Sequence, residues 1–308
     1  MSNSLKPFPI GLFLAPKYWP TWLALGIVKL ITLLPLRVLA AMGHGVGMAA
    51  YKLGASRRKI AFKNIQSCFP ELSTAECEAI NKQHFSLVGQ SVFTVPANMW
   101  IGAKRFASRI EVIEREHYDK ALQTNRNIIL LAPHFVGLDA GGFAVSQERD
   151  AITMYQYAKN GLMDEIVKRG RGRYGGVLIE RKAPLRQTIK AIRKGMPFYY
   201  LPDQDAGRKG VFVPFFHPLA STVPMLGKFA KMSNAVVIPV KTKVKPKGKG
   251  YEVSFGAPLE NFPSGDDMAD TLTMNQAVEA MIRTMPEQYF WVHKRFKTRP
   301  PEEEGKFY

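Results

Sequence analysis

The sequence is short of cysteine and of acidic residues. It holds two cysteines in 308 residues, Cys68 and Cys77, which is too few for a disulfide framework, so we expect both thiols to be reduced. Its 25 acidic residues stand against 43 basic ones, which gives a formal net charge of +18. A balance this basic favours anionic partners: nucleic acid, phospholipid head groups, or phosphorylated or acidic substrates.

Several motifs are absent as well. No Gly-x-Ser-x-Gly elbow presents a serine nucleophile, and no spacing of His, Cys, Asp and Glu is typical of metal ligands. We therefore expect neither a metal nor a cofactor. The basic residues form no stripe with interleaved aromatics and no recognition helix, which argues against a nucleic-acid-binding protein.

One apolar stretch near the N-terminus is suited to a membrane. Trp19-Pro20-Thr21-Trp22 precedes an apolar run from Leu23 to Leu34, and tryptophans favour a membrane boundary. Lys29 and the shortness of the run argue against a clean span. The alternatives are a short tilted span, a helix lying in the membrane interface, an ordinary buried helix, and a cleaved signal peptide, which ranks low because no persuasive cleavage site is present.

This stretch divides the chain in two. We predict a hydrophobic membrane helix within an anchor of residues 1–45, followed by one catalytic domain of residues 46–308. Four basic residues within 56–65 follow the anchor closely. Such a cluster attracts an anionic leaflet and indicates the cytoplasmic side.

Short apolar runs alternate with helical patterns beyond residue 110. This alternation predicts an α/β fold, with a mixed, mostly parallel central sheet flanked by helices. The expected strands are 128–132, 151–157, 177–180, 197–201, 235–240 and 251–255. The expected helices are 138–146, 162–169, 184–194, 223–232, 268–285 and one that Ser73 and Glu76 open as a capping box and that runs towards Trp100.

The most informative stretch follows the first of these strands. His134 comes directly after it, and Asp139 lies five positions on, at the expected start of a helix. Open α/β sheets gather reactive groups at the carboxyl ends of their strands. An aspartate that accepts the imidazole N–H would fix the tautomer, so that the other ring nitrogen can remove a proton from a hydroxyl. The alternative is a surface histidine near a helix-capping aspartate.

Two further clusters stand at strand ends. Arginines among glycines before the strand at 177, Arg171 and Arg173, are suited to binding an anion such as phosphate. After the strand at 201, Asp203 and Asp205 suggest acid/base work or a divalent metal, whereas the adjacent basic pair suggests that they orient cations; that pair is Arg208 and Lys209. Three phenylalanines then form either core or an apolar groove for an acyl chain: Phe212, Phe215 and Phe216.

The chain resembles the lipid A late acyltransferases, the lauroyl and myristoyl transferases within the HxxxxD acyltransferase superfamily. The resemblance covers almost the whole length. It is carried by Arg57-Arg58 to Asn64, Cys68-Phe69-Pro70-Glu71-Leu72, His134 to Asp139, the Arg171/Arg173 loop, Pro202-Asp203-Gln204-Asp205 with Gly207-Arg208-Lys209, Phe212-Val213-Pro214-Phe215-Phe216, 230–235 and 286–300.

This resemblance implies a glycerophosphate-acyltransferase-like fold and a reaction. Members of the family move an acyl chain from acyl-carrier protein to a hydroxyl of a lipid A precursor, at the cytoplasmic face of the inner membrane of Gram-negative bacteria. His134 would be the general base and Asp139 would orient it. Arg171, or its rival Arg173, would hold a phosphate or the oxyanion, and Asp203 would orient that arginine.

The implied partners are acyl-carrier protein, a lipid A precursor and anionic inner-membrane phospholipid, with no nucleic acid. Two alternatives remain. One is an acyltransferase that acts on a lysophospholipid or another membrane lipid, against which the match at 286–300 argues. The other is a non-catalytic basic protein that binds nucleic acid.

Overall fold

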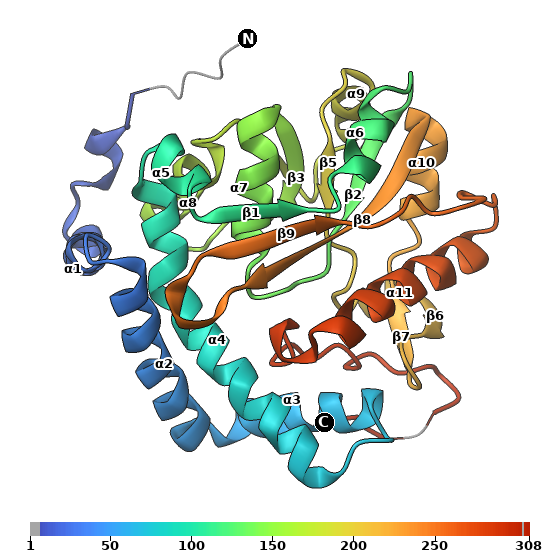
Figure 1. Cartoon of the computed structure of the whole chain (residues 1–308), viewed down its shortest axis with the longest axis horizontal. Helices are drawn as coiled ribbons and strands as arrows, with labels where there is room; N and C mark the ends of the chain where they lie inside the picture. The colour runs from blue at the N-terminus through green and yellow to red at the C-terminus, as the bar shows by residue number, and fades with distance from the viewer. Residues whose placement is uncertain (1–6, 304) are drawn as a thin grey trace.

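A seven-stranded sheet forms the centre of the computed structural model, which describes residues 7–303 and 305–308. The strand order is β1-β9-β8-β2-β5-β3-β4, and the neighbours are parallel except β8 and β9 (Figure 1). A separate antiparallel hairpin joins β6 to β7. The strands are β1 (Ile110–Ile113), β2 (Asn127–Leu131), β3 (Ala151–Tyr155), β4 (Gly176–Glu180), β5 (Phe198–Tyr200), β6 (Val211–Pro214), β7 (Leu219–Thr222), β8 (Ala235–Val244) and β9 (Tyr251–Phe255).

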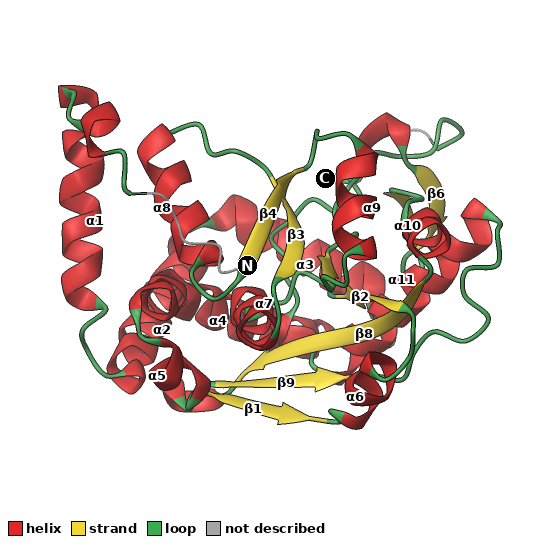
Figure 2. Ribbon diagram, turned by 90° about the horizontal axis from the view of Figure 1, so that it is seen from above, coloured by secondary structure: helices red, strands yellow, loops and turns green. Residues whose placement is uncertain are grey.

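Helices cover both faces of this sheet (Figure 2). They are α1 (Trp19–Ile31), α2 (Leu36–Leu53), α3 (Ala55–Cys68), α4 (Thr74–Trp100), α5 (Ala103–Ala107), α6 (Glu116–Leu122), α7 (Leu138–Glu148), α8 (Gly161–Gly172), α9 (Leu185–Arg193), α10 (Leu226–Ser233) and α11 (Asp267–Thr284). The predicted mixed, mostly parallel α/β architecture is confirmed. The predicted capping box is also present, with Ser73 and Glu76 satisfying each other's backbone N–H groups.

Strand β2 shows how the sheet is buried on both faces. Ile129 and Leu131 pack into the core formed with α3, α9, α10 and α11. Ile128 and Leu130 pack into the opposite core with α6. Successive side chains of a strand point to opposite faces, so a strand covered on both sides is apolar throughout. This burial fixes the end of β2, from which His134 follows.

The N-terminal helices pack in different ways. Helix α2 lies along α4 at facing glycines, where a Cβ on Gly89 would come within 2.2 Å of the Gly43 carbonyl oxygen. Only glycine allows the two backbones to approach this closely. Helix α2 also runs through residue 45, where the sequence places the end of the anchor.

Helix α1 buries none of its residues and stands at the periphery in both overall views (Figures 1 and 2). It has 13 residues, and about 20 apolar residues are needed to cross a bilayer. Within residues 7–303 and 305–308, no helix joins enough length to enough apolar character for a crossing, which corrects the alternative of a short span. Residues 1–6 of the predicted anchor lie outside the described residues.

The segment 286–298 returns to the end of β2 and holds it. The Val136 N–H donates to the Gln288 carbonyl at 2.8 Å, and the Phe290 N–H donates to the His134 carbonyl at 3.0 Å. Trp291 and Phe296 of this segment are fully buried. The backbone on both sides of His134 is therefore fixed by residues that come more than 150 positions later.

Candidate active site

The ends of two neighbouring strands bring a histidine and an aspartate together. Strands β2 and β5 are parallel, with Leu131 opposite Tyr200. His134 lies three residues beyond Leu131, and Asp203 lies three residues beyond Tyr200. Because the register is matched, the two side chains leave the same edge of the sheet side by side.

Two hydrogen bonds join this pair. Asp203 Oδ1 lies 2.7 Å from His134 Nδ1, and Asp203 Oδ2 accepts the His134 backbone N–H at 2.8 Å. The Asp203 side chain is 1% exposed and that of His134 is 23% exposed. The carboxylate only accepts, so Nδ1 carries the hydrogen and Nε2 of the neutral ring keeps its lone pair.

Burial and neighbouring charges shift the pKa values of both His134 and Asp203. Burial acts to lower the pKa of the His134 imidazole, but attraction to the Asp203 carboxylate raises it above its ordinary value. Burial acts to raise the pKa of the Asp203 carboxyl, yet His134 and the buried Arg295 hold it below its usual range. The Asp203 carboxylate is therefore ionised, and it orients the His134 imidazole and makes it more basic.

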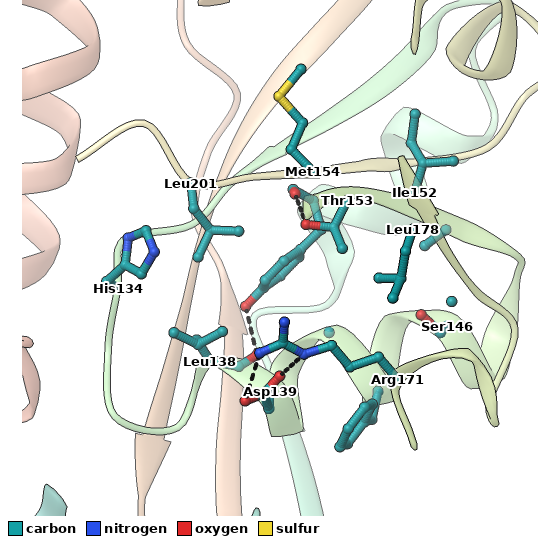
Figure 3. A pocket seen from close by; sticks show the side chains of 15 residues that line it. His134, Leu138, Asp139, Ser146, Ile152, Thr153, Met154, Arg171, Leu178 and Leu201 are labelled. Atoms are coloured by element: carbon teal, nitrogen blue, oxygen red, sulfur yellow. Dashed lines mark hydrogen bonds and ion pairs between the residues drawn. The ribbon is translucent and has the colours of Figure 1, made fainter. Parts of the chain in front are cut away.

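Asp139 has a different partner from the one expected. It accepts from Arg171 Nε at 2.8 Å, and this ion pair stands on the cavity wall, apart from the His134 ring (Figure 3). The sequence suggested that His134 pairs with Asp139 and Arg171 with Asp203. In the structure His134 pairs with Asp203, and Arg171 pairs with Asp139. The reason is that α7 begins at Leu138 and directs Asp139 towards α8, whose last turn holds Arg171. Arg171 therefore lies on a helix and not on the expected loop.

A cavity of about 160 Å³ adjoins His134, Asp139 and Arg171. Its other walls come from α7, β3, β4 and the strand end at β5, and they are mainly apolar (Figure 3). The wall residues are Leu138, Gly142, Phe143, Ser146, Ala151, Ile152, Thr153, Met154, Gly176, Leu178, Tyr199 and Leu201. A mainly apolar cavity beside an imidazole is suited to an apolar ligand.

The three phenylalanines that the sequence offered as core or as an acyl groove do not line this cavity. Phe215 is fully buried against Phe296 and the Arg295 guanidinium, and Phe216 packs on Phe69. Phe212 stands on the β6–β7 hairpin. None of the three lines the cavity beside His134. Sequence alone could not separate core from groove here, because both are apolar.

The remaining predicted basic residues are exposed. Arg173 follows the end of α8, two positions beyond Arg171. Arg208 and Lys209 form a short 3-10 turn after β5. The structure brings none of these three into the cavity wall. Asp205 is also taken up structurally, because it accepts from the Thr298 backbone N–H at 3.1 Å and from its hydroxyl at 3.0 Å.

Sequence reasoning missed three residues of this centre. Gln204 Nε2 lies 3.1 Å from His134 Nε2. Arg295, 2% exposed, donates to the Gln204 and Ser221 carbonyls and to the Thr222 hydroxyl. Tyr289 donates to the Asp203 carbonyl at 3.3 Å. Both stretches that hold them carry the resemblance, Pro202-Asp203-Gln204-Asp205 for Gln204 and 286–300 for Tyr289 and Arg295, but neither gives these three residues a chemical role. Among the described residues, no three His, Cys, Asp or Glu side chains gather as a metal site.

Comparison with known proteins covers nearly the whole chain. The sequence model of the bacterial lipid A biosynthesis acyltransferases matches residues 10–298. The lipid A biosynthesis lauroyltransferase of Escherichia coli (strain K12) is 37% identical over 301 residues, which cover 97% of each chain. A lipid A biosynthesis acyltransferase of Haemophilus influenzae is 35% identical over 314 residues and the full length of both. The E. coli lipid A biosynthesis palmitoleoyltransferase is 32% identical over 94% of each chain.

Proposed function

Because the chain belongs to the bacterial lipid A biosynthesis acyltransferase family, we propose that it transfers a fatty acyl chain from an acyl-carrier protein thioester to a hydroxyl of a lipid A precursor. The observation that carries this proposal is the His134–Asp203 pair beside an apolar cavity. It supplies a base without a nucleophile of its own, so the acceptor hydroxyl is the nucleophile.

The reaction is a direct transfer. His134 Nε2 takes the proton of the acceptor hydroxyl while the hydroxyl oxygen attacks the thioester carbonyl carbon. The new C–O bond forms, the carbonyl oxygen becomes an oxyanion, and the C–S bond then breaks. The imidazolium returns its proton to the leaving sulfur. Asp203 holds the ring and stabilises its charged form throughout, since both of its oxygens face His134.

The acyl chain of the donor occupies the cavity. Its walls of leucine, isoleucine, methionine and phenylalanine remove the chain from water, and the His134 side chain lines the same space. Small residues, Gly142, Ser146, Ala151 and Gly176, form part of the lining. Their size sets how far the chain extends, so we expect them to influence donor chain length.

Arg171 and Asp139 form the polar part of this wall. Attraction to Asp139 raises the pKa of the Arg171 guanidinium, which therefore keeps its charge beside the cavity. Its side chain is 31% exposed, which leaves N–H donors available to an oxyanion or a phosphate. Arg173, and more remotely Arg208 and Lys209, supply further positive charge for a phosphorylated acceptor or for an acidic carrier protein.

We place the enzyme on the cytoplasmic side of the bacterial inner membrane, with α1 in the interface. Large apolar residues recur along one side of this helix at Trp19, Leu23, Ile27 and Leu30, and each is at least half exposed. A spacing of three to four residues puts them on one face. A helix with such a face lies in the boundary between head groups and acyl chains, next to anionic phospholipid.

The test is acyl transfer by the purified full-length protein. Acyl-carrier proteins loaded with C10 to C16 chains are offered with a Kdo-modified lipid A precursor, and products are weighed by mass spectrometry. We expect a gain of one acyl group, reduced about 10²–10⁴-fold in His134→Ala. His117→Ala, at a half-buried histidine of α6 that does not line the cavity, is the matched control. Equal turnover by His134→Ala would refute the base assignment. Acylation of a lysophospholipid, and not of the lipid A precursor, would replace the proposed acceptor.

A further inference from the structure

The side-chain amide of Gln204 is hydrogen-bonded to Nε2 of His134, the nitrogen that acts as the base. Its Nε2 lies 3.1 Å from His134 Nε2, although the glutamine itself is exposed. With Asp203 accepting the Nδ1 hydrogen, Nε2 of the neutral imidazole has a lone pair and no hydrogen. The Gln204 amide therefore donates an N–H to the same lone pair that must receive the proton of the acceptor hydroxyl.

The backbone beneath this amide is held in place. Tyr289 donates to the Asp203 carbonyl at 3.3 Å, and Arg295 donates to the Gln204 carbonyl at 3.3 Å. The Thr298 backbone N–H donates to the side-chain carboxylate of the next residue, Asp205, at 3.1 Å. Three consecutive residues are thus bound to the 286–298 segment, which leaves the exposed Gln204 side chain as the part that can withdraw from the imidazole by rotation about its own bonds.

We propose that Gln204 is a catalytic residue: its amide N–H fills the position of the acceptor hydroxyl in the free enzyme, gives way when the hydroxyl arrives, and then donates to the oxyanion of the tetrahedral intermediate. This inference rests on the proposed function. This role of Gln204 leaves the proton balance of the acyl transfer unchanged, because the amide donates a hydrogen bond and neither gains nor loses a proton.

Geometry also supports the second role of the Gln204 amide, donation to the oxyanion. The hydroxyl that replaces the amide comes within hydrogen-bond distance of His134 Nε2, and the oxyanion forms on the carbon bonded to that hydroxyl. The displaced amide remains tethered to a fixed backbone beside these atoms. A donor near the developing charge typically contributes about 10²–10³-fold in kcat. Until the acceptor binds, the same amide also keeps the base hydrogen-bonded.

The test compares two near-isosteric variants with wild type. Gln204→Leu removes both the donor and the acceptor. Gln204→Glu keeps the shape but offers only acceptor oxygens near the forming oxyanion. We expect Gln204→Leu to lower kcat about 10²–10³-fold, with a KM for the lipid acceptor within a few-fold of wild type. Gln123→Leu, an exposed glutamine after α6, is the matched control and leaves kcat unchanged.

A pH profile separates this role from a structural one. The charged groups around the imidazole are Asp203, Asp139 and Arg171, with His293 close enough to interact with it. A carboxylate at position 204 stabilises the imidazolium, so in Gln204→Glu we expect a higher His134 pKa and an acid limb of kcat/KM displaced to higher pH. The ¹⁵N NMR signal of His134 Nε2 should also move in both variants.

The outcomes are distinct. Unchanged kcat in Gln204→Leu, or an unmoved Nε2 signal in both variants, overturns the role of Gln204 while His134→Ala remains inactive. A wild-type protein that transfers no acyl group overturns the proposed function and this inference with it. Gln204 is exposed, so thermal unfolding midpoints within a degree or two of wild type exclude misfolding as the cause of lost activity.

Discussion

Replacing Asp203 with asparagine tests which carboxylate orients the base. The carboxylate has two oxygens, and each serves one donor of the same residue: Oδ1 the Nδ1–H of His134 and Oδ2 its backbone N–H. An asparagine has one oxygen and one NH₂ group. Whichever way the amide points, one of the two His134 donors faces another donor.

The size of the effect follows from this mismatch. If the amide oxygen serves the backbone N–H, its NH₂ faces Nδ1 and imposes the wrong tautomer. If it serves Nδ1, the backbone N–H loses its partner in a buried site, at a cost of about 1–3 kcal/mol. In either orientation the charge that stabilises the imidazolium is gone. In a serine protease the corresponding change costs about 10⁴-fold, so we expect roughly 10³–10⁴-fold in kcat, or about 4–5.5 kcal/mol.

The pH dependence should change in a defined direction. Burial acts to lower the His134 pKa, and the Asp203 carboxylate raises it above its ordinary value. Below that pKa the imidazole is protonated and cannot act as a base, so activity falls on the acid side. Without the carboxylate the pKa drops, and the acid limb of kcat/KM moves to lower pH.

The assay is acyl transfer followed by mass spectrometry over a range of pH, with Asp119→Asn on the exposed face of α6 as the control. Asp139→Asn, which weakens the Arg171 ion pair and leaves the imidazole contact intact, should cost less than Asp203→Asn. An Asp203→Asn enzyme within tenfold of wild type, together with an inactive Asp139→Asn enzyme, would refute the assignment and restore the pairing that the sequence suggests.

Three further predictions concern the cavity, the membrane and the core. A Cβ at Gly142 would meet only the Tyr199 ring within 4 Å, at 3.8 Å, so the position tolerates a side chain that projects into the cavity. Gly142→Leu should therefore shift donor preference to shorter chains in a competition between acyl-carrier proteins; an unchanged preference would show that Gly142 does not limit the length of the bound chain. Leu23→Glu with Leu30→Glu should reduce sedimentation with anionic vesicles by tenfold or more, whereas retained binding would exclude α1 as the contact. Arg295→Met removes three hydrogen bonds that a buried charged group makes, to the Gln204 and Ser221 carbonyls and to the Thr222 hydroxyl, and should lower the free energy of unfolding by about 2–5 kcal/mol in urea; a loss below 1 kcal/mol would contradict this.

Much of the fold was predictable because its signals are local. Apolar runs identified β2, β3, β4, β5, β9 and the first half of β8. The signal is clearest in β2, where Ile128 to Leu131 are buried on both faces and all apolar. Helix α4 was identified from the Ser73–Glu76 capping box, which needs only four residues. Strand β1 and the β6–β7 hairpin were missed. The β1 strand is short and half-exposed, and the apolar hairpin sequence reads equally well as core or as groove.

The candidate site was predictable as a set of residues but not as a set of pairs. His134, Asp139, Arg171 and Asp203 all lie at this centre, yet the two acids exchange partners. The pairing depends on which strands are neighbours and on their register, because Leu131 opposite Tyr200 places His134 beside Asp203. Strand order arises from contacts between distant parts of the chain, and a spacing of five residues in sequence carries no information about it.

The 286–298 segment also dictates when the enzyme becomes able to act. During synthesis the ribosome produces His134, Asp203 and Gln204 long before Phe290, Tyr289 and Arg295, which hydrogen-bond to the backbone carbonyls of those three residues. A nascent chain released up to α11 holds every residue of the sheet but lacks the support of its reactive edge. We therefore expect a premature stop in this late stretch to remove activity although most of the protein is translated.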